Sequence, residues 1–161
     1  MGSSLLTQRP NRFLRAGLRL PLWIYRLHLG WLLGDRFILL THIGRISGRP
    51  RQTVVEVVRH DKTTGVCVVA SGWGGKSDWF RNIQKTPVVT INLGNHKLAA
   101  KAVVLPEGEA ANALHDYALR HPIAFRELAT IIAGRQLTSA ELSSNELARG
   151  IPFVAFYPDR P

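Results

Sequence analysis

Residues 37–105 consist of short apolar or alternating stretches separated by short turns that contain glycine. The alternation is clear at 52–60, where Val55 and Val57 stand on either side of Glu56, as expected of a strand with one buried face. A two-residue turn such as Gly94-Asn95 joins antiparallel strands, whereas parallel neighbours need a long crossover. The sequence therefore predicts an antiparallel sheet in which strands that follow one another in the chain mostly pair with one another.

Helical patterns interrupt and follow these strands. A short helix is predicted at 78–85, with Ser77 or Asp78 as its N-cap. The length of 161 residues and the hydrophobic content of 45% suit one core of ordinary size. We therefore predict a single α+β domain, an antiparallel barrel of about six strands with N-terminal helices and a C-terminal helical segment. The predicted strands are 37–42, 52–60, 66–71, 88–93, 96–105 and 152–157, and the later helices are 107–120, 122–133 and one that opens with the capping box Thr138–Glu141.

The first 35 residues form an apolar, arginine-rich extension ahead of a barrel core at 36–105 and of the helices and last strand at 106–161. The formal net charge is +10, and residues 1–60 contain ten arginines, no lysine and only two acidic residues. One or two helices are predicted within 13–34, but charged residues interrupt them too often for a membrane span. They suit either packing on the core or an amphipathic helix lying in an anionic membrane surface.

The cysteine and histidine residues argue against a disulfide-stabilised protein and against a metal-binding protein. The single cysteine, Cys67, lies in an apolar strand, which excludes a disulfide framework and indicates a reducing compartment. The six histidines have no ligand spacing, so we predict no metal site. No signal-peptide layout is visible, and we expect a cytoplasmic protein that is peripheral at the inner face of the membrane if its N-terminal helices bind lipid.

Two loops carry the residues best suited to bind an anionic ligand. The first, 44–51, combines three arginines, a serine and two glycines, which offer bidentate guanidinium contacts and close backbone approach to a phosphate. Its composition alone leaves a solvated basic hairpin as an alternative. The second, 70–77, leads from a strand into a helix, where backbone N–H groups favour anions. It is similar to a Walker A loop, but Ala70 replaces the first glycine and no βαβ crossover follows, which argues against a nucleotide hydrolase.

The two loops and the helix after them resemble the deazaflavin-dependent nitroreductase family of the FMN-binding split-barrel superfamily. The resemblance covers about residues 37–105 and extends weakly to 151–154. It implies a split β-barrel and an oxidoreductase that transfers a hydride from reduced coenzyme F420 to an apolar acceptor such as a quinone, an enone or a nitro compound. Coenzyme F420 is a 5-deazaflavin with a phosphate-bearing polyglutamate tail. The matching segments are Leu39-Leu40-Thr41-His42-Ile43-Gly44-Arg45-Ile46-Ser47-Gly48-Arg49-Pro50-Arg51, Val68-Val69-Ala70-Ser71-Gly72, Asp78-Trp79-Phe80-Arg81-Asn82, and Pro87 before the strand from Val88.

The resemblance also implies roles for particular positions. One departure concerns Ile46, which stands where the family usually has a basic residue. This removes a charge from the expected phosphate site and keeps FMN as an alternative cofactor, while Arg49 is the nearest replacement for that charge. The implied phosphate and tail contacts are Arg45, Ser47, Gly48 and Arg51, the implied ring contacts are Ala70, Ser71 and Gly72, and Trp79 and Asn82 are the implied packing and tail contacts beside them.

Hydride transfer asks the protein mainly for orientation and for exclusion of water, which agrees with the lack of a catalytic triad in the sequence. Ser71 is the candidate catalytic residue, because its hydroxyl can donate to a substrate oxygen on which charge develops. Tyr25, Tyr117 and Tyr157 are unranked candidates for protonating the product. The competing interpretation is a non-enzymatic basic module for nucleic acid or anionic lipid, and the lack of a recognition helix and of an aromatic stacking platform argues against nucleic acid. The sequence leaves the oligomeric state open.

Overall fold

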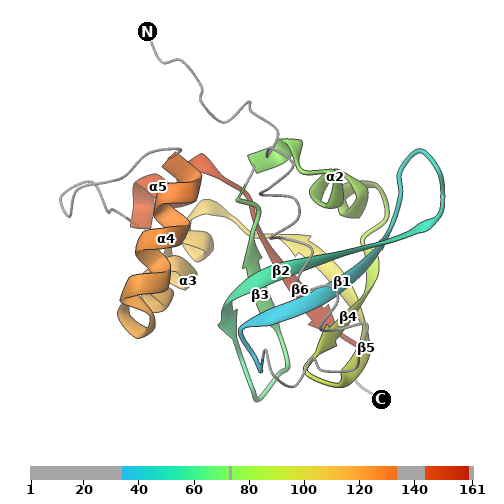
Figure 1. Ribbon diagram of the computed structural model, residues 1–161, viewed down its shortest axis with the longest axis horizontal. Coiled ribbons are helices and arrows are strands. Elements are labelled where there is room, and N and C mark those ends of the chain that lie inside the picture. Colours follow the sequence, from blue (N-terminus) through green and yellow to red (C-terminus); the bar gives the residue numbers. More distant parts are fainter. Residues whose placement is uncertain (1–33, 73, 134–143, 160–161) are drawn as a thin grey trace, which may run out of the picture.

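The computed structural model describes residues 34–72, 74–133 and 144–159. The predicted N-terminal helices and the predicted capping box lie outside these residues. None of the helices in the described part of the chain has both the length and the apolar character needed to cross a bilayer. The described elements, shown in Figure 1, are β1 (Phe37–Ile43), β2 (Pro50–His60), β3 (Cys67–Ala70), the 3-10 helix η3 (Gly74–Lys76), α2 (Asp78–Lys85), β4 (Val88–Leu93), β5 (His96–Val104), α3 (Glu107–Arg120), α4 (Pro122–Ala133), α5 (Ser144–Gly150) and β6 (Phe153–Pro158).

The strands close into a barrel in the order β1-β2-β3-β6-β5-β4, and every neighbouring pair is antiparallel. Three hairpins join strands that follow one another in sequence, whereas β6 returns from the helical segment and fills the gap between β3 and β5. Closure pairs β1 with β4 and leaves none of these strands as an open edge. The predicted α+β class with an antiparallel barrel of six strands and a C-terminal helical segment is confirmed.

Strand β6 divides two hydrophobic clusters. Val154 and Phe156 belong to the cluster inside the barrel, whereas Phe153 and Ala155 belong to the cluster between the barrel and the helices. A strand that is buried on both faces is expected to be a continuous apolar run, as residues 153–156 are. Figure 1 shows that α3, α4 and α5 lie together on one side of the barrel and that α2 lies apart from them, near β1 and β2.

The predicted bounds of α2, α3, α4 and β4 agree with the observed ones. Strand β2 begins at Pro50, two residues earlier than predicted, because Pro50 pairs with Ile43 of β1. Proline is accepted as the first residue of a strand, where its missing N–H costs little. The hairpin loop is thereby reduced to residues 44–49, and β3 is shorter than predicted at both ends.

Two isoleucines in different surroundings test the assignment of the core. Ile91 of β4 has no exposed surface and belongs to the cluster inside the barrel, whereas Ile46 in the β1–β2 loop is 91% exposed. Ile91→Ala should lower the free energy of unfolding by about 2 to 5 kcal/mol, because it removes buried methylene groups and leaves a cavity. Ile46→Ala, the same chemical change, should alter it by less than about 0.5 kcal/mol. Urea unfolding measures both, and equal losses would contradict the assignment.

Candidate active site

Helix α2 lies between the two loops identified in the sequence and forms hydrogen bonds with both. On one side, Nη2 of Arg45 lies 3.1 Å from Oδ1 of Asp78, the first residue of α2. On the other side, Nε of Arg81, in the first turn of α2, donates to the carbonyl oxygen of Gly75 in the second loop over 3.3 Å. The two loops, which are separated in sequence by β2 and β3, are therefore brought together at the start of one helix.

The first loop is folded tightly by its two glycines. Gly48 has a φ of +66°, which favours glycine, and its N–H donates to the carbonyl oxygen of Gly44 over 2.8 Å. A Cβ atom at Gly44 would lie 2.6 Å from Oγ of Ser47, so a side chain there would push this hydroxyl aside. The Ser47 hydroxyl itself accepts a hydrogen bond from the N–H of Arg49 over 3.3 Å. Ser47 and Gly48 are exposed.

Asn82 connects the first loop to α2. It is 4% exposed, and its Oδ1 accepts hydrogen bonds from the backbone N–H of Arg45 over 3.0 Å and from Nη1 of the same residue over 3.1 Å. Lys85, one turn further along α2, donates from Nζ to the carbonyl oxygen of Arg45 over 2.8 Å. Asn82 therefore holds both the backbone and the guanidinium of Arg45, so in the described structure it supports a neighbouring cation.

The other end of the Asn82 amide reaches His42, which sequence reasoning counted only among scattered histidines. Since Oδ1 of Asn82 accepts two hydrogen bonds, Nδ2 is the donor to Nδ1 of His42, at 3.0 Å, and the imidazole proton is on Nε2. Burial of the ring and the nearby charge of Arg51 lower the pKa of His42 to about 4. His42 follows Ile38 and Leu40 at two-residue intervals along β1, and this position was the signal in the sequence that it is buried.

The arginines of the first loop differ in how they are held. The Arg45 side chain is 28% exposed and is fixed by Asn82 and Asp78. Arg49 and Arg51 are exposed, and none of the described carboxylates forms an ion pair with either. The loop thus presents one fixed guanidinium and two that extend into solvent.

The hydroxyl of Ser71, the predicted catalytic group, is fully buried. It donates to the carbonyl oxygen of Gly74 over 2.8 Å and also contacts Oγ of Ser77 at 2.8 Å, while its backbone N–H donates to the carbonyl oxygen of Pro152. Gly74 has a φ of +68°, and its N–H returns to the carbonyl oxygen of Ser71. In this structure the hydroxyl therefore holds the second loop together and contacts no open surface. Its expected neighbours along the chain, Ala70 and Gly72, are half-buried.

Trp79 packs inside the protein. It is 9% exposed, its ring meets that of Phe80 edge to face with centroids 6.1 Å apart, and both belong to the cluster inside the barrel. Of the two roles implied for Trp79, packing is the one that the described contacts support. Through Trp79, Phe80 and Ile83, α2 is held firmly on the barrel.

The described tyrosines lie away from the two loops. Tyr117 of α3 is buried, and its hydroxyl donates to Oε1 of Glu56 in the middle of β2. Burial and this carboxylate raise the pKa of Tyr117 well above its usual value, which makes it a poor proton donor at neutral pH. Tyr157 is at the end of β6 that is remote from the second loop, since Ala70 pairs with Phe153 at the other end. Tyr25 lies outside the described residues.

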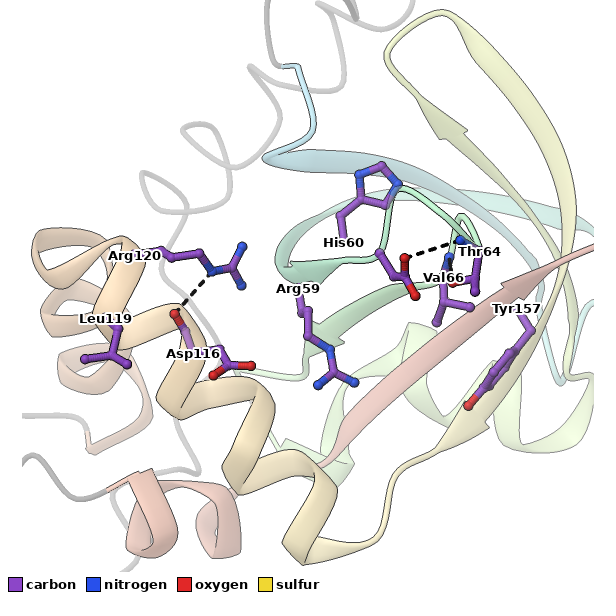
Figure 2. A pocket seen from close by; sticks show the side chains of 9 residues that line it. Arg59, His60, Thr64, Val66, Asp116, Leu119, Arg120 and Tyr157 are labelled. Atoms are coloured by element: carbon purple, nitrogen blue, oxygen red, sulfur yellow. Dashed lines mark hydrogen bonds between the residues drawn. The ribbon is translucent and has the colours of Figure 1, made fainter.

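Tyr157 instead lines an open groove of about 790 Å³ (Figure 2). In Figure 2 the guanidinium of Arg59 lies between α3 and β6, whereas Arg120 extends from α3 towards β2, where its Nη2 donates to the carbonyl oxygen of Val58 over 3.3 Å. This groove is at the opposite end of β2 from Pro50, so it is separated from the first loop by roughly 30 Å of strand. None of the residues implied as cofactor contacts lines it. The lining residues are Arg59, His60, Asp61, Thr64, Val66, Asp116, Leu119, Arg120 and Tyr157.

The remaining reactive groups form no second centre among the described residues. No group of three His, Cys, Asp or Glu side chains in residues 34–72, 74–133 and 144–159 could hold a metal ion. Cys67 is buried inside the barrel, and burial raises the pKa of its thiol to about 12, so the thiol stays protonated and unreactive.

Comparison with known proteins agrees with the barrel and adds a family. The model of a family described as F420H(2)-dependent quinone reductase matches residues 19–137. No curated protein matches the sequence. A solved structure titled F420-H2 dependent reductase (FDR-A) is 21% identical, with 77% of this chain and 96% of that chain covered and a TM-score of 0.53. An FMN binding protein related to pyridoxamine 5'-phosphate oxidase, from Nostoc punctiforme PCC 73102, is 12% identical, with 94% and 81% covered and a TM-score of 0.50. At these identities the two structures show a shared fold.

The buried, neutral His42 predicts a pH dependence of stability. Its pKa is about 4 in the folded chain and about 6.5 in the unfolded chain, so between these values the unfolded chain binds the additional proton. The stabilisation is therefore complete above about pH 6.5 and is lost as the pH falls towards 4, by about 2 to 3 kcal/mol at pH 4.5.

His42→Asn is the matched variant, since its Oδ1 can accept the hydrogen bond from Asn82 and does not titrate. Urea unfolding at pH 7 and pH 4.5 should give a smaller loss for this variant than for the wild type. Parallel losses in the two proteins would show that other groups cause the pH dependence.

Proposed function

Because the chain belongs to the F420H2-dependent quinone reductase family and is an oxidoreductase that depends on F420, we propose that the two loops joined by α2 form its cofactor site. The phosphate and tail of F420 would lie along the first loop and the deazaflavin ring beside the second. The observation that carries this proposal is the set of hydrogen bonds from α2 to both loops, from Asp78 and Asn82 to Arg45 and from Arg81 to Gly75. With the family established, the alternatives of an FMN reductase and of a non-enzymatic basic module are not retained.

The first loop suits the anionic part of the cofactor. Three of the five N–H groups of the Arg45 guanidinium are not used by Asn82 or Asp78, and Arg49 and Arg51 extend from the same loop. The space beside Gly48 is open, since a Cβ atom there would meet nothing within 4 Å, and this allows a phosphate to approach the backbone. Arg49 supplies the positive charge that Ile46 does not.

We propose that the deazaflavin ring lies against the second loop. Reduced F420, when bound, supplies the hydride. The chain supplies a rigid wall, because Ser71 is hydrogen-bonded to Gly74 and Ser77 and its backbone is tied to Pro152. We propose that Ser71 is a positioning residue that sets the shape of this wall, and that orientation and exclusion of water are the main contributions of the protein.

The acceptor is an apolar small molecule, and we propose a quinone. Reduction of a quinone needs a hydride and a proton but no covalent attachment to the protein. This agrees with loops that only hold and orient the cofactor. We propose that water donates this proton, because Tyr117 and Tyr157, the described candidate donors, lie away from the two loops.

Substitution of Arg51 tests the phosphate assignment. Arg51→Ala should weaken F420 binding by about 1.5 to 3 kcal/mol, or about 10-fold to 150-fold in Kd, as expected when a charged hydrogen bond is lost. Arg59→Ala, at the other end of the same strand, is the matched control and should leave the Kd unchanged. Fluorescence titration of the cofactor measures both. Equal affinities of the wild type and Arg51→Ala would remove Arg51 from the site.

We also propose that residues 13–34 contact an anionic membrane surface, where an apolar quinone would be dissolved. The support is the alternation of Trp, Tyr and Leu with arginine in this segment. Changing Arg15, Arg19 and Arg26 together to Gln should remove about 3 kcal/mol of attraction, at roughly 1 kcal/mol for each basic residue. Co-sedimentation with vesicles of anionic lipid should therefore fall strongly, with neutral vesicles as the control. Undiminished co-sedimentation of the triple variant would contradict membrane contact through these arginines.

A further inference from the structure

Asp78 is an exception to the charge of the proposed cofactor site. The two loops and α2, residues 44–51 and 70–85, contain six basic residues and a single acidic one. That acidic residue, Asp78, does not point away from the basic groups, because its Oδ1 lies 3.1 Å from Nη2 of Arg45. The basic residues are Arg45, Arg49, Arg51, Lys76, Arg81 and Lys85.

The two partners of this ion pair are held very differently. Arg45 is fixed by Asn82, which holds both its backbone N–H and its Nη1, and its side chain is 28% exposed. The side chain of Asp78 is 83% exposed, and Arg45 is its one hydrogen-bonding partner among the described side chains. The carboxylate can therefore turn away into water at little cost in free energy, since an exposed ion pair contributes little to stability. The guanidinium, in contrast, keeps its place when the ion pair opens.

We propose that Asp78 is a specificity-determining residue that competes with the anionic part of the cofactor for Arg45. This inference rests on the proposed function, because it takes the first loop to be the phosphate site. Asp78 occupies one edge of a guanidinium that an incoming phosphate needs, and its negative charge opposes that phosphate. The carboxylate thereby weakens binding of every anion at this site.

Such competition would let one acidic residue make a basic site selective among anions. Six basic residues would attract any anion, including inorganic phosphate and nucleic acid. A ligand that carries several anionic groups and a flat ring has enough contacts to displace the carboxylate, whereas a ligand with one anionic group has few. Specificity is then obtained by opposing the wrong ligands as well as by attracting the right one.

The test uses Asp78→Asn in the full chain. The amide oxygen of asparagine can still accept the hydrogen bond from Arg45, so the variant removes the charge and retains the contact. Asp116→Asn is the matched control, because Asp116 is also exposed and lies on α3, beside the remote groove. Each protein is titrated with F420 and with the deazaflavin that lacks the phosphate and tail, at low salt and at about 1 M salt.

Asp78→Asn should bind F420 about twofold to fivefold more tightly than the wild type at low salt, as expected for an exposed pair of charges. The gain should vanish at about 1 M salt, where the Debye length is about 3 Å, and should be absent with the deazaflavin that lacks phosphate. Asp116→Asn should bind like the wild type. A role in positioning alone would instead leave the Asn variant with unchanged affinity at both salt concentrations.

Unchanged or weaker F420 binding by Asp78→Asn, with a wild type that binds, would overturn the competition and leave the cofactor site in place. A gain of the same size with the phosphate-free deazaflavin, or in Asp116→Asn, would also overturn it, since the effect would then be one of net charge. A folded wild type that does not bind F420 would overturn the proposed function itself, and the role of Asp78 with it.

Discussion

The amide of Asn82 is the contact on which the arrangement of the candidate site depends. Asn82 is buried. Its oxygen accepts hydrogen bonds from the backbone and side chain of Arg45, and its nitrogen donates to the ring of His42. A primary amide can accept from two donors through its oxygen while its separate nitrogen donates to a third partner. A carboxylate at this position would lack the donor for His42, and an apolar residue would leave three polar groups without their partner. Asn82 therefore fixes the geometry between β1, the first loop and α2.

That contact can be rigid because α2 is anchored independently. Trp79, Phe80 and Ile83 extend from α2 into the cluster inside the barrel, so the helix is placed by hydrophobic packing rather than by its polar bonds. The polar side chains of the same helix are then directed at the loops. Closure of the barrel contributes as well, since β1 carries His42 and is paired on both sides, with β2 and with β4. The site is thus built on a helix anchored in the core and on a strand paired along both edges.

The sequence predicted the elements well because each depends on local patterns. The bounds of α2 and β4 follow from apolar spacing and from flanking turn residues, and these signals are contained within a few residues of the element. The partners of individual side chains could not be predicted in the same way. Residues 42, 45 and 82 include partners that are distant in sequence and that meet only in the folded barrel. Ser71 is close in sequence to Gly74 and Ser77, but no local pattern indicated that its hydroxyl would form hydrogen bonds with them. The resemblance to a family identified the positions of interest. The described contacts then distinguish the residues that hold neighbouring groups in place from those that are exposed to a ligand.

The distribution of arginine shows why net charge alone was a poor guide to a ligand. Half of the ten arginines in residues 1–60 lie in the described part of the chain, and their side chains have different partners. Arg36 pairs with Glu56, Arg45 is held by Asn82 and Asp78, and Arg59 lines the remote groove. Arg49 and Arg51 remain as exposed charges beside a fixed guanidinium. A charge that is already paired inside the fold attracts a distant anion weakly, whereas a fixed and partly open one can orient it. The capacity of this surface to hold an anionic cofactor therefore depends on a small number of positioned groups and far less on a total of +10.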